Sequence, residues 1–147
     1  MSGIVVGVDG SDGSKPALEW AAAEARTREL PLTAVYAWSA PATLYAGLGW
    51  VPADTEVLVD LRKLAERRLA EVCEELGPAL ADVQVERKVV EGPAANALLA
   101  AAEDADLLVV GTRGHGGFTG LLLGSVSQQC AHHCPCPIVI VPLQPER

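Results

Sequence analysis

The sequence predicts an α/β fold in which an open five-stranded parallel sheet carries helices on both faces. Two observations predict it. Short apolar, β-branched runs alternate with longer segments of helical periodicity in the order β-α-β-α-β-α-β-α-β. Glycine, proline or acidic residues mark most of the boundaries between them. The chain has 147 residues, of which 50% are hydrophobic. That is enough for one core and too little for two, so we expect a single domain over residues 1–147.

The N-terminal part of the chain opens with a β-branched run at residues 4–8, which ends in Gly, Asp and Ser. This pattern predicts a buried strand followed by a turn. Ser14 and Pro16 begin a helix with small apolar residues along one side. Pro31 breaks that pattern, and residues 32–38 are expected to form the second strand.

The middle of the chain contains a long loop, a long helix and a strand. The loop runs from residue 39 to about residue 54, and loops of this length are usually functional or mobile. Apolar residues recur at helical spacing over residues 57–76, and Gly77-Pro78 is expected to stop this helix. Over residues 83–89, valines alternate with polar residues, which predicts the third strand.

The C-terminal part supplies the remaining elements. Gly92-Pro93 precedes a helix predicted over 94 to about 102, which is followed by a fourth strand at 107–110. A helix over 126 to about 133 and a fifth strand at 138–141 complete the alternation. This last strand is short, apolar and terminal, so we expect it to lie at an edge of the sheet that needs cover.

The composition excludes several classes of protein. With 19 acidic and 11 basic residues the formal net charge is −8, which disfavours a generic nucleic-acid binder. No apolar run reaches the roughly 18 residues of a membrane span. The segment Met1 to Asp9 has neither a positive n-region nor a cleavage site, so we expect a cytoplasmic protein. The four cysteines do not predict a disulfide framework in a chain of this size.

Two segments of unusual composition follow strands that we expect to end at the same edge of the sheet. One is Gly7 to Ser11, and the other is the glycine-rich stretch 111–117. Ligands of open parallel sheets bind outside the carboxyl ends of the strands, where the strand order reverses. Glycines let backbone N–H groups approach a phosphate, and a helix beginning at Ser125 would direct its first amides to the same anion. The stretch therefore predicts an anion-binding loop, with a flexible connector as the alternative.

Two familiar phosphate-binding loops are absent. A Walker A loop requires Gly-Lys, but Phe118 follows Gly117 and no lysine occurs after Lys88. A dinucleotide-binding fingerprint belongs after the first strand, where this chain has Asp-Gly-Ser-Asp-Gly-Ser at residues 9–14. A P-loop NTPase is excluded, and NAD or FAD bound in that manner is disfavoured.

The spacing Gly111-x2-Gly114-x9-Gly124-Ser125 resembles the ATP-binding signature of the universal stress protein family. The resemblance extends over the whole chain, at Val5-Val6-Gly7-Val8-Asp9-Gly10-Ser11, Val90-Glu91-Gly92-Pro93-Ala94, Ala105-Asp106-Leu107-Leu108-Val109-Val110-Gly111, Leu123-Gly124-Ser125-Val126-Ser127 and Cys136-Pro137-Ile138-Val139-Ile140-Val141. It implies a Rossmann-like fold of the adenine nucleotide alpha hydrolase type. It also implies a stress-response protein that binds ATP, ADP or AMP, with Mg²⁺ or Mn²⁺ held through the phosphates. A homodimer is implied as well, formed through the last strand, Ile138, Val139, Ile140 and Val141.

The resemblance assigns roles to particular residues. Asp9 is expected to accept hydrogen bonds from the ribose or adenine side, and the backbone of Ala37 to meet adenine. Gly7 would permit close backbone approach, or simply pack in a tight strand. Gly111 and Gly114 would shape the phosphate loop, with Gly124, Ser125 and Val126 at the β- and γ-phosphates. Between the glycines lie Thr112, Arg113, His115, Gly116 and Gly117. Arg113 either compensates triphosphate charge or is an ordinary solvated arginine.

Three functions remain open. The first is a nucleotide sensor or regulator without fast catalysis, because Asp9 and His115 are the only candidate bases and neither has an evident partner; hydrolysis, if any, would be slow. The second is an enzyme that cleaves ATP between the α- and β-phosphates, which would need a Ser-Gly-Gly-x-Asp-Ser loop that residues 9–14 do not provide. The third is a dimeric interaction module with a vestigial pocket.

Two other groups of residues invite a functional interpretation. One is a cluster of histidines and cysteines near the end of a predicted helix: Cys130, His132, His133, Cys134 and Cys136. Zinc binding is disfavoured for this cluster, because it lacks a Cys-x2-Cys pair and because residues that alternate along a helix end point in different directions. Three aromatic residues in or beside the long loop would form either a lid over adenine or an interface: Trp38, Tyr45 and Trp50. Protection of this loop from protease by ATP would favour the lid.

Overall fold

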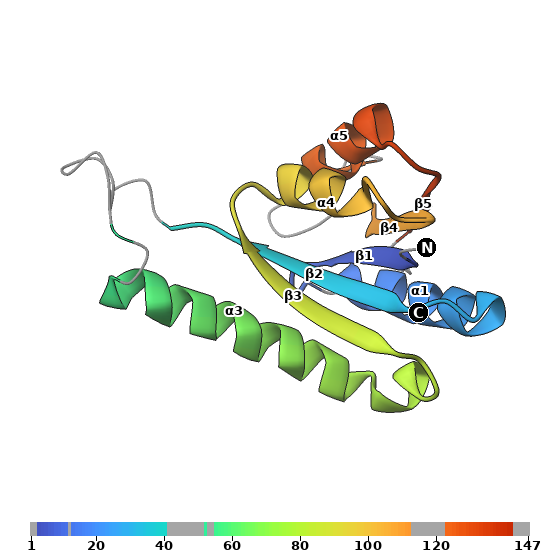
Figure 1. The fold of residues 1–147 in the computed structure, drawn as a ribbon, viewed down its shortest axis with the longest axis horizontal. Helices are drawn as coiled ribbons and strands as arrows, with labels where there is room; N and C mark the ends of the chain where they lie inside the picture. The colour runs from blue at the N-terminus through green and yellow to red at the C-terminus, as the bar shows by residue number, and fades with distance from the viewer. Residues whose placement is uncertain (1–2, 12, 41–51, 53–54, 113–122, 143–147) are drawn as a thin grey trace.

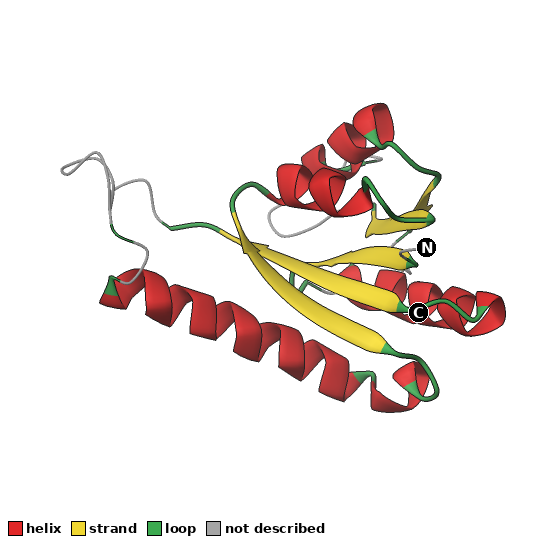
Figure 2. Ribbon diagram, viewed as in Figure 1, coloured by secondary structure: helices red, strands yellow, loops and turns green. Residues whose placement is uncertain are grey.

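The strands form one parallel sheet in the order β3-β2-β1-β4-β5 (Figures 1 and 2). The computed structural model describes residues 3–11, 13–40, 52, 55–112 and 123–142. Within them the strands are β1 (Ile4–Val8), β2 (Leu32–Trp38), β3 (Val85–Glu91), β4 (Leu107–Gly111) and β5 (Ile138–Val141). The chain moves outward from β1 to β3, then returns to β4 on the other side of β1. The strand order therefore reverses between β1 and β4, as the predicted fold class requires.

Helices cover both faces of the sheet (Figure 1). They are α1 (Ser14–Arg28), α3 (Glu56–Glu75), the short 3₁₀ helix η1 (Gly77–Leu80), α4 (Ala94–Ala102) and α5 (Ser125–His133). α1 and α3 lie on one face, and α4 and α5 lie on the other. In the part of the chain described here, none of the helices has both the length and the apolar character that crossing a membrane requires.

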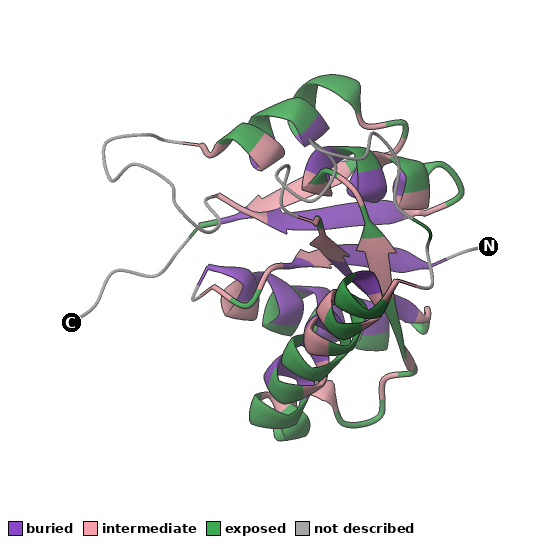
Figure 3. Cartoon of the chain, turned by 90° about the vertical axis from the view of Figure 1, so that its left-hand side faces the viewer, coloured by how far each residue is buried: buried purple, intermediate pink, exposed green. Residues whose placement is uncertain are grey.

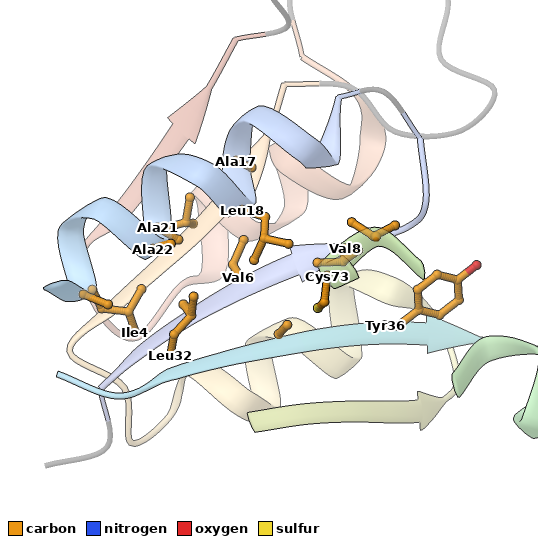
Figure 4. Close-up of a cluster of buried hydrophobic side chains, with 14 of the residues drawn as sticks. Ile4, Val6, Val8, Ala17, Leu18, Ala21, Ala22, Leu32, Tyr36 and Cys73 are labelled. Carbon is orange, nitrogen blue, oxygen red and sulfur yellow. The ribbon is translucent and has the colours of Figure 1, made fainter. Parts of the chain in front are cut away.

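Side chains of the central strands alternate between two hydrophobic clusters. Ile4 and Val6 of β1 pack towards α1 and α3 together with Leu18 (Figure 4). Val5 packs on the opposite face, in the cluster that includes Leu98 of α4. Because β1 and β4 are covered on both faces, they are almost continuously apolar, as is usual for parallel strands. Figure 3 shows this contrast between buried central strands and exposed outer helix surfaces.

The two edges of the sheet differ in chemistry. β3 exposes Glu86, Arg87 and Lys88, whereas β5 consists of four apolar residues, Ile138 to Val141. Each is paired on one side in the described residues: β3 with β2, and β5 with β4.

The predicted elements are all present. The strands predicted over 4–8, 32–38 and 138–141 and the helix over 94–102 have these bounds in the structure, and the boundaries that differ elsewhere do so by one or two residues. The third strand begins at Val85 rather than Val83, because its pairing with β2 starts at Leu32↔Val85. The long helix occupies Glu56–Glu75, and Gly77-Pro78 converts its end into η1 instead of stopping all helical structure. The amide of Ala79 donates to the carbonyl of Leu76 at 2.8 Å, which is the tighter bonding of a 3₁₀ turn.

Candidate functional site

The two segments singled out from the sequence follow β1 and β4, the strands on either side of the reversal in strand order. These strands pair in parallel, with Val6 opposite Val109, and they end at Val8 and Gly111. The segment that begins at Asp9 and the segment Gly111-Thr112 therefore meet at one edge of the sheet. This edge is where open α/β sheets bind their ligands.

The turn after β1 is held by the side chain of Asp9. Its Oδ1 accepts a hydrogen bond from the Ser11 amide at 2.9 Å and another from the Ser11 hydroxyl. Gly10 takes the left-handed conformation that this turn needs, with φ +80°. The hydroxyl of Ser14 then donates to the Ser11 carbonyl at 2.9 Å and leads the chain into α1. Asp9 therefore has a structural role in addition to any contact with a ligand.

Thr112 connects β4, β5 and α5. Its amide donates to the carbonyl of Val141 at 3.1 Å, and its carbonyl accepts a hydrogen bond from the amide of Gly124 at 2.6 Å. The Ser127 hydroxyl lies 2.9 Å from the same carbonyl and 3.0 Å from that of Gly124. The residues on either side of the segment 113–122 are therefore fixed beside each other at the end of β4.

The helix that starts at this point has no side-chain cap in the part of the chain that the structure describes. Gly124 is the N-cap of α5, and the first turn contains no acidic residue. Ser125 is exposed and Val126 is half-buried. α1 begins in the same way, behind Gly13, with neither a side-chain cap nor an acidic first turn. In the described residues, the N-termini of α1 and α5 therefore both lie beside the reversal point without a side-chain cap, and a helix N-terminus of this kind favours an anion.

Gly7 and Ala37 lie on the α4 side of the sheet. A Cβ built on Gly7 would stand 2.8 Å from Cδ1 and 3.2 Å from Cδ2 of Leu98. Close packing against α4 is thus sufficient to explain this glycine. Ala37 is half-buried near the end of β2, in the same cluster as Leu98, and pairs with Val90 of β3.

Two site residues were not identified from the sequence. Ser127 is 2% exposed and holds the Thr112 carbonyl, but a serine in a first helical turn carries no signal for a partner 15 residues away. Tyr36 is 7% exposed at the end of β2, and a Cβ on Gly10 would lie 3.9 Å from its Oη (Figure 4). The alternation of β2 predicts that Tyr36 is buried, but not that it borders the turn after β1.

Several predicted residues lie outside the described part of the chain, namely Arg113, Gly114, His115, Gly116 and Gly117 in the glycine-rich stretch, and Tyr45 and Trp50 in the long loop. Trp38 is described. It packs partly buried against the α1 and α3 cluster, and its indole N–H is buried with no acceptor in the described residues. The structure therefore places one of the three proposed lid residues, on the opposite face from Ala37.

Within the histidine and cysteine cluster, Cys134 and Cys136 come together, with their Sγ atoms 3.7 Å apart. His132 and His133 are exposed, with ring centroids 6.4 Å apart, while Cys130 is fully buried. Among the residues that the structure describes, no three His, Cys, Asp or Glu side chains are arranged to hold a metal ion.

The strand order, the reversal between β1 and β4 and the two uncapped helices define a doubly wound α/β domain with its candidate ligand site at the reversal point. The family model of the universal stress protein family matches residues 1–142, and the chain belongs to this family. Universal stress protein Rv2623 of Mycobacterium tuberculosis (strain ATCC 25618 / H37Rv) is 36% identical over 138 residues, which are 93% of this chain and 44% of that protein. The chain thus spans less than half the length of the curated relatives that it matches.

Solved structures agree with the fold. Universal stress protein UspA from Lactobacillus plantarum superposes with a TM-score of 0.75 at 21% identity, covering 95% of this chain and 97% of that one. A universal stress protein crystallised in complex with cAMP gives a TM-score of 0.68 at 30% identity, covering 97% of this chain and 98% of that one.

Proposed function

We propose that this chain binds an adenine nucleotide at the reversal point between β1 and β4 and acts as a sensor or regulator in a stress response, without fast catalysis. The observation that carries the proposal is the arrangement around Thr112, which fixes the uncapped N-terminus of α5 at the end of β4. The first amides of a helix have no acceptor within the helix, so the amides that begin α5 are the donors that we expect a phosphate to meet. The cAMP complex of a relative 30% identical to this chain supports an adenine nucleotide as the ligand.

Each side of the nucleotide would meet a different part of the site. The phosphates would lie at Gly124, Ser125 and Val126, whose amides and hydroxyl are donors. The ribose or adenine side would lie towards Asp9, and adenine against the backbone at Ala37. Because backbone groups would recognise adenine, ATP, ADP and AMP are all candidate ligands.

A divalent cation fits this site only in association with the phosphates. In the described residues the site offers amides, hydroxyls and the carboxylate of Asp9, but no group of three metal ligands. Mg²⁺ usually binds proteins through one or two carboxylates together with substrate phosphates. Mg²⁺ or Mn²⁺ would therefore enter with the nucleotide and neutralise its charge.

Slow turnover is expected from the chemistry of the described residues. Hydrolysis requires a base that positions and deprotonates a water beside the phosphate under attack. Oδ1 of Asp9 already accepts two hydrogen bonds from Ser11, which holds it in the turn. A sensor that retains its nucleotide fits this site better than an enzyme that consumes it.

The test has two steps. Small molecules released by denaturing freshly purified protein are identified by mass spectrometry, and the stripped protein is then titrated calorimetrically with ATP and Mg²⁺. Co-purified or saturably bound adenine nucleotide is the expected result. A protein that is empty and gives no binding heat with ATP, ADP, AMP or cAMP would contradict the proposal and favour an interaction module. Release of pyrophosphate would instead indicate cleavage between the α- and β-phosphates.

The double variant Gly114→Val with Gly124→Val is expected to lose ATP binding while it stays folded. Gly124 has φ −77° and ψ 171°, a conformation that valine adopts readily, so the change adds bulk beside the amides without backbone strain. Calorimetric titration measures the loss. Gly77→Val is the matched control, because a Cβ at Gly77 meets nothing within 4 Å and lies in η1, outside the site. Unchanged affinity in the double variant would place the phosphates elsewhere.

A further inference from the structure

Two thiols meet in the chain between α5 and β5. The Sγ atoms of Cys134 and Cys136 are 3.7 Å apart, with Pro135 as the one residue between them. Both cysteines are partly exposed, whereas Cys73 is 3% exposed and Cys130 is fully buried. The pair therefore combines mutual contact with access to solvent, which the two buried cysteines lack.

The backbone on both sides of the pair is anchored. Cys134 is the C-cap of α5, and its amide donates to the Cys130 carbonyl at 2.9 Å. After Cys136, the carbonyl of Pro137 accepts a hydrogen bond from the Leu108 amide of β4 at 3.0 Å. Pro135 restricts the backbone between the two thiols further, because its ring fixes φ. The sulfur atoms are thus held close to each other by the fold.

We propose that Cys134 and Cys136 form a reactive dithiol, which low-molecular-weight disulfides oxidise to an intramolecular disulfide. One thiolate of the pair attacks the added disulfide RSSR, forms a mixed disulfide with one RS group and releases the other as RSH. The second thiolate then attacks the protein sulfur of that mixed disulfide and expels the remaining RSH. Two electrons pass from the dithiol to RSSR, and both protein thiol protons end on the two RSH molecules.

The surroundings of Cys136 determine how the rate of exchange through its thiol depends on pH. Burial is the largest cause that raises the pKa of Cys136 to about 11, followed by the hydrogen bond and the charge of Cys134. A hydrogen bond with the Leu108 backbone lowers this pKa, and the charge of Asp106 raises it further. Exchange through this thiol therefore accelerates about tenfold per pH unit between neutral pH and its pKa. Its proximity to Cys134 compensates, because ring closure needs no second molecule.

Cys130 is expected to be a bystander. Burial raises the pKa of its thiol to about 11, with the charge of Cys134 as a lesser cause, and the side chain is fully buried. Burial likewise raises the pKa of Cys73, although the charge and hydrogen bond of Arg87 oppose the effect. Neither offers an accessible thiolate, so the exchange is confined to the exposed pair.

The experiment uses the reduced chain of 147 residues and the aromatic disulfide 5,5′-dithiobis(2-nitrobenzoic acid) at about pH 8. We expect the native protein to release two equivalents of thionitrobenzoate, to lose two hydrogen atoms in intact mass, and to yield one peptide that contains the Cys134–Cys136 link. Excess dithiothreitol is expected to restore the original mass. Cys134→Ser and Cys136→Ser are each expected to release one equivalent and to keep one thionitrobenzoate adduct.

Cys73→Ala is the matched control and should behave like the native sequence, because Cys73 lies in α3, away from the pair. Circular dichroism confirms that each variant is folded. Stable adducts on both thiols of the native protein, a disulfide between two chains, or no release before denaturation would overturn the proposal. So would single variants that close a disulfide as the native protein does. None of these outcomes depends on whether the chain binds a nucleotide.

Discussion

Close packing against a neighbouring side chain explains why position 7 is a glycine. The sequence left two interpretations open, close approach of a ligand or tight packing, and Leu98 of α4 occupies the space that a Cβ would need. We expect Gly7→Ala to displace Leu98 and to lower the free energy of unfolding by about 1–3 kcal/mol, the usual cost of overpacking a core. Urea denaturation measures this change.

A smaller side chain at position 98 should relieve the strain. Leu98→Val removes one methylene from the contact, so Gly7→Ala is expected to cost less in that background than in the native one. Gly77→Ala, with open space around it, serves as the control for replacing a glycine. Equal costs of Gly7→Ala in the two backgrounds would contradict the packing explanation.

Asp9 and Thr112 differ in how much of their hydrogen bonding could be predicted from the sequence. An Asp two residues before a Ser is a recognisable turn pattern, and Oδ1 of Asp9 does accept the Ser11 amide. The contacts of Thr112 with Val141, Gly124 and Ser127 are not local, and residue types alone do not specify which carbonyl a distant amide will meet. The sequence indicates which segments form the site, whereas the hydrogen bonds that hold them require the fold.

Among the elements, α1 and η1 are joined by one arginine. Nη2 of Arg26 donates to the carbonyls of Ala79 at 2.9 Å and Ala81 at 2.8 Å, and its Nε lies 3.3 Å from the latter. These carbonyls end η1 and have no further helical turn to bond. Arg26→Ala is therefore expected to destabilise the protein by about 1–2 kcal/mol, measured by urea unfolding.

Arg28 provides the comparison for this prediction. It lies two residues further along α1 and pairs with Glu24 at 2.7 Å, on the exposed i,i+4 surface of the same helix. Such pairs contribute about 0.3–0.5 kcal/mol. Arg28→Ala should therefore cost less than Arg26→Ala, and Arg26→Lys should restore only part of the loss, because an ammonium lacks the planar fork. Equal effects at the two positions would show that the contacts with η1 add nothing.

The order and type of the elements follow from sequence periodicity, and their ends do not. β1 and β4 are apolar throughout because both of their faces are buried, so their pattern is unambiguous. β3 is half exposed and its register is set by pairing with β2, which is why the valine pattern misplaced its start. η1 was missed because Gly77-Pro78 indicates the end of an α-helix equally well when a 3₁₀ turn follows.

At the scale of the whole molecule, β5 offers an unpaired edge in the described residues, through which we propose that two copies associate. The carbonyls of Pro137 and Val141 accept hydrogen bonds from the amides of Leu108 and Thr112, so the backbone groups of every second residue, counted from Pro137, face β4. The amide and carbonyl of Ile140 consequently point away from the sheet. Ile140→Pro removes this outward amide without removing a donor to β4, and we expect it to convert dimers into monomers in light scattering after size-exclusion chromatography.

Ile140→Thr keeps the amide and a β-branched side chain, so it is the control and should remain dimeric. Circular dichroism checks that both variants are folded. A native protein that elutes as a monomer, or a proline variant that stays dimeric, would contradict pairing through β5.

The unlike edges of this sheet limit what such pairing can build. Glu86, Arg87 and Lys88 are exposed on β3, and charges of this kind keep an edge strand from accepting another chain. If β5 is the only edge that can pair with another chain, contact between two copies is isologous, and it buries the free β5 edge of both copies. The assembly then closes at two subunits instead of extending head to tail into a filament, and the charged edge protects a concentrated solution of the protein from fibrous association.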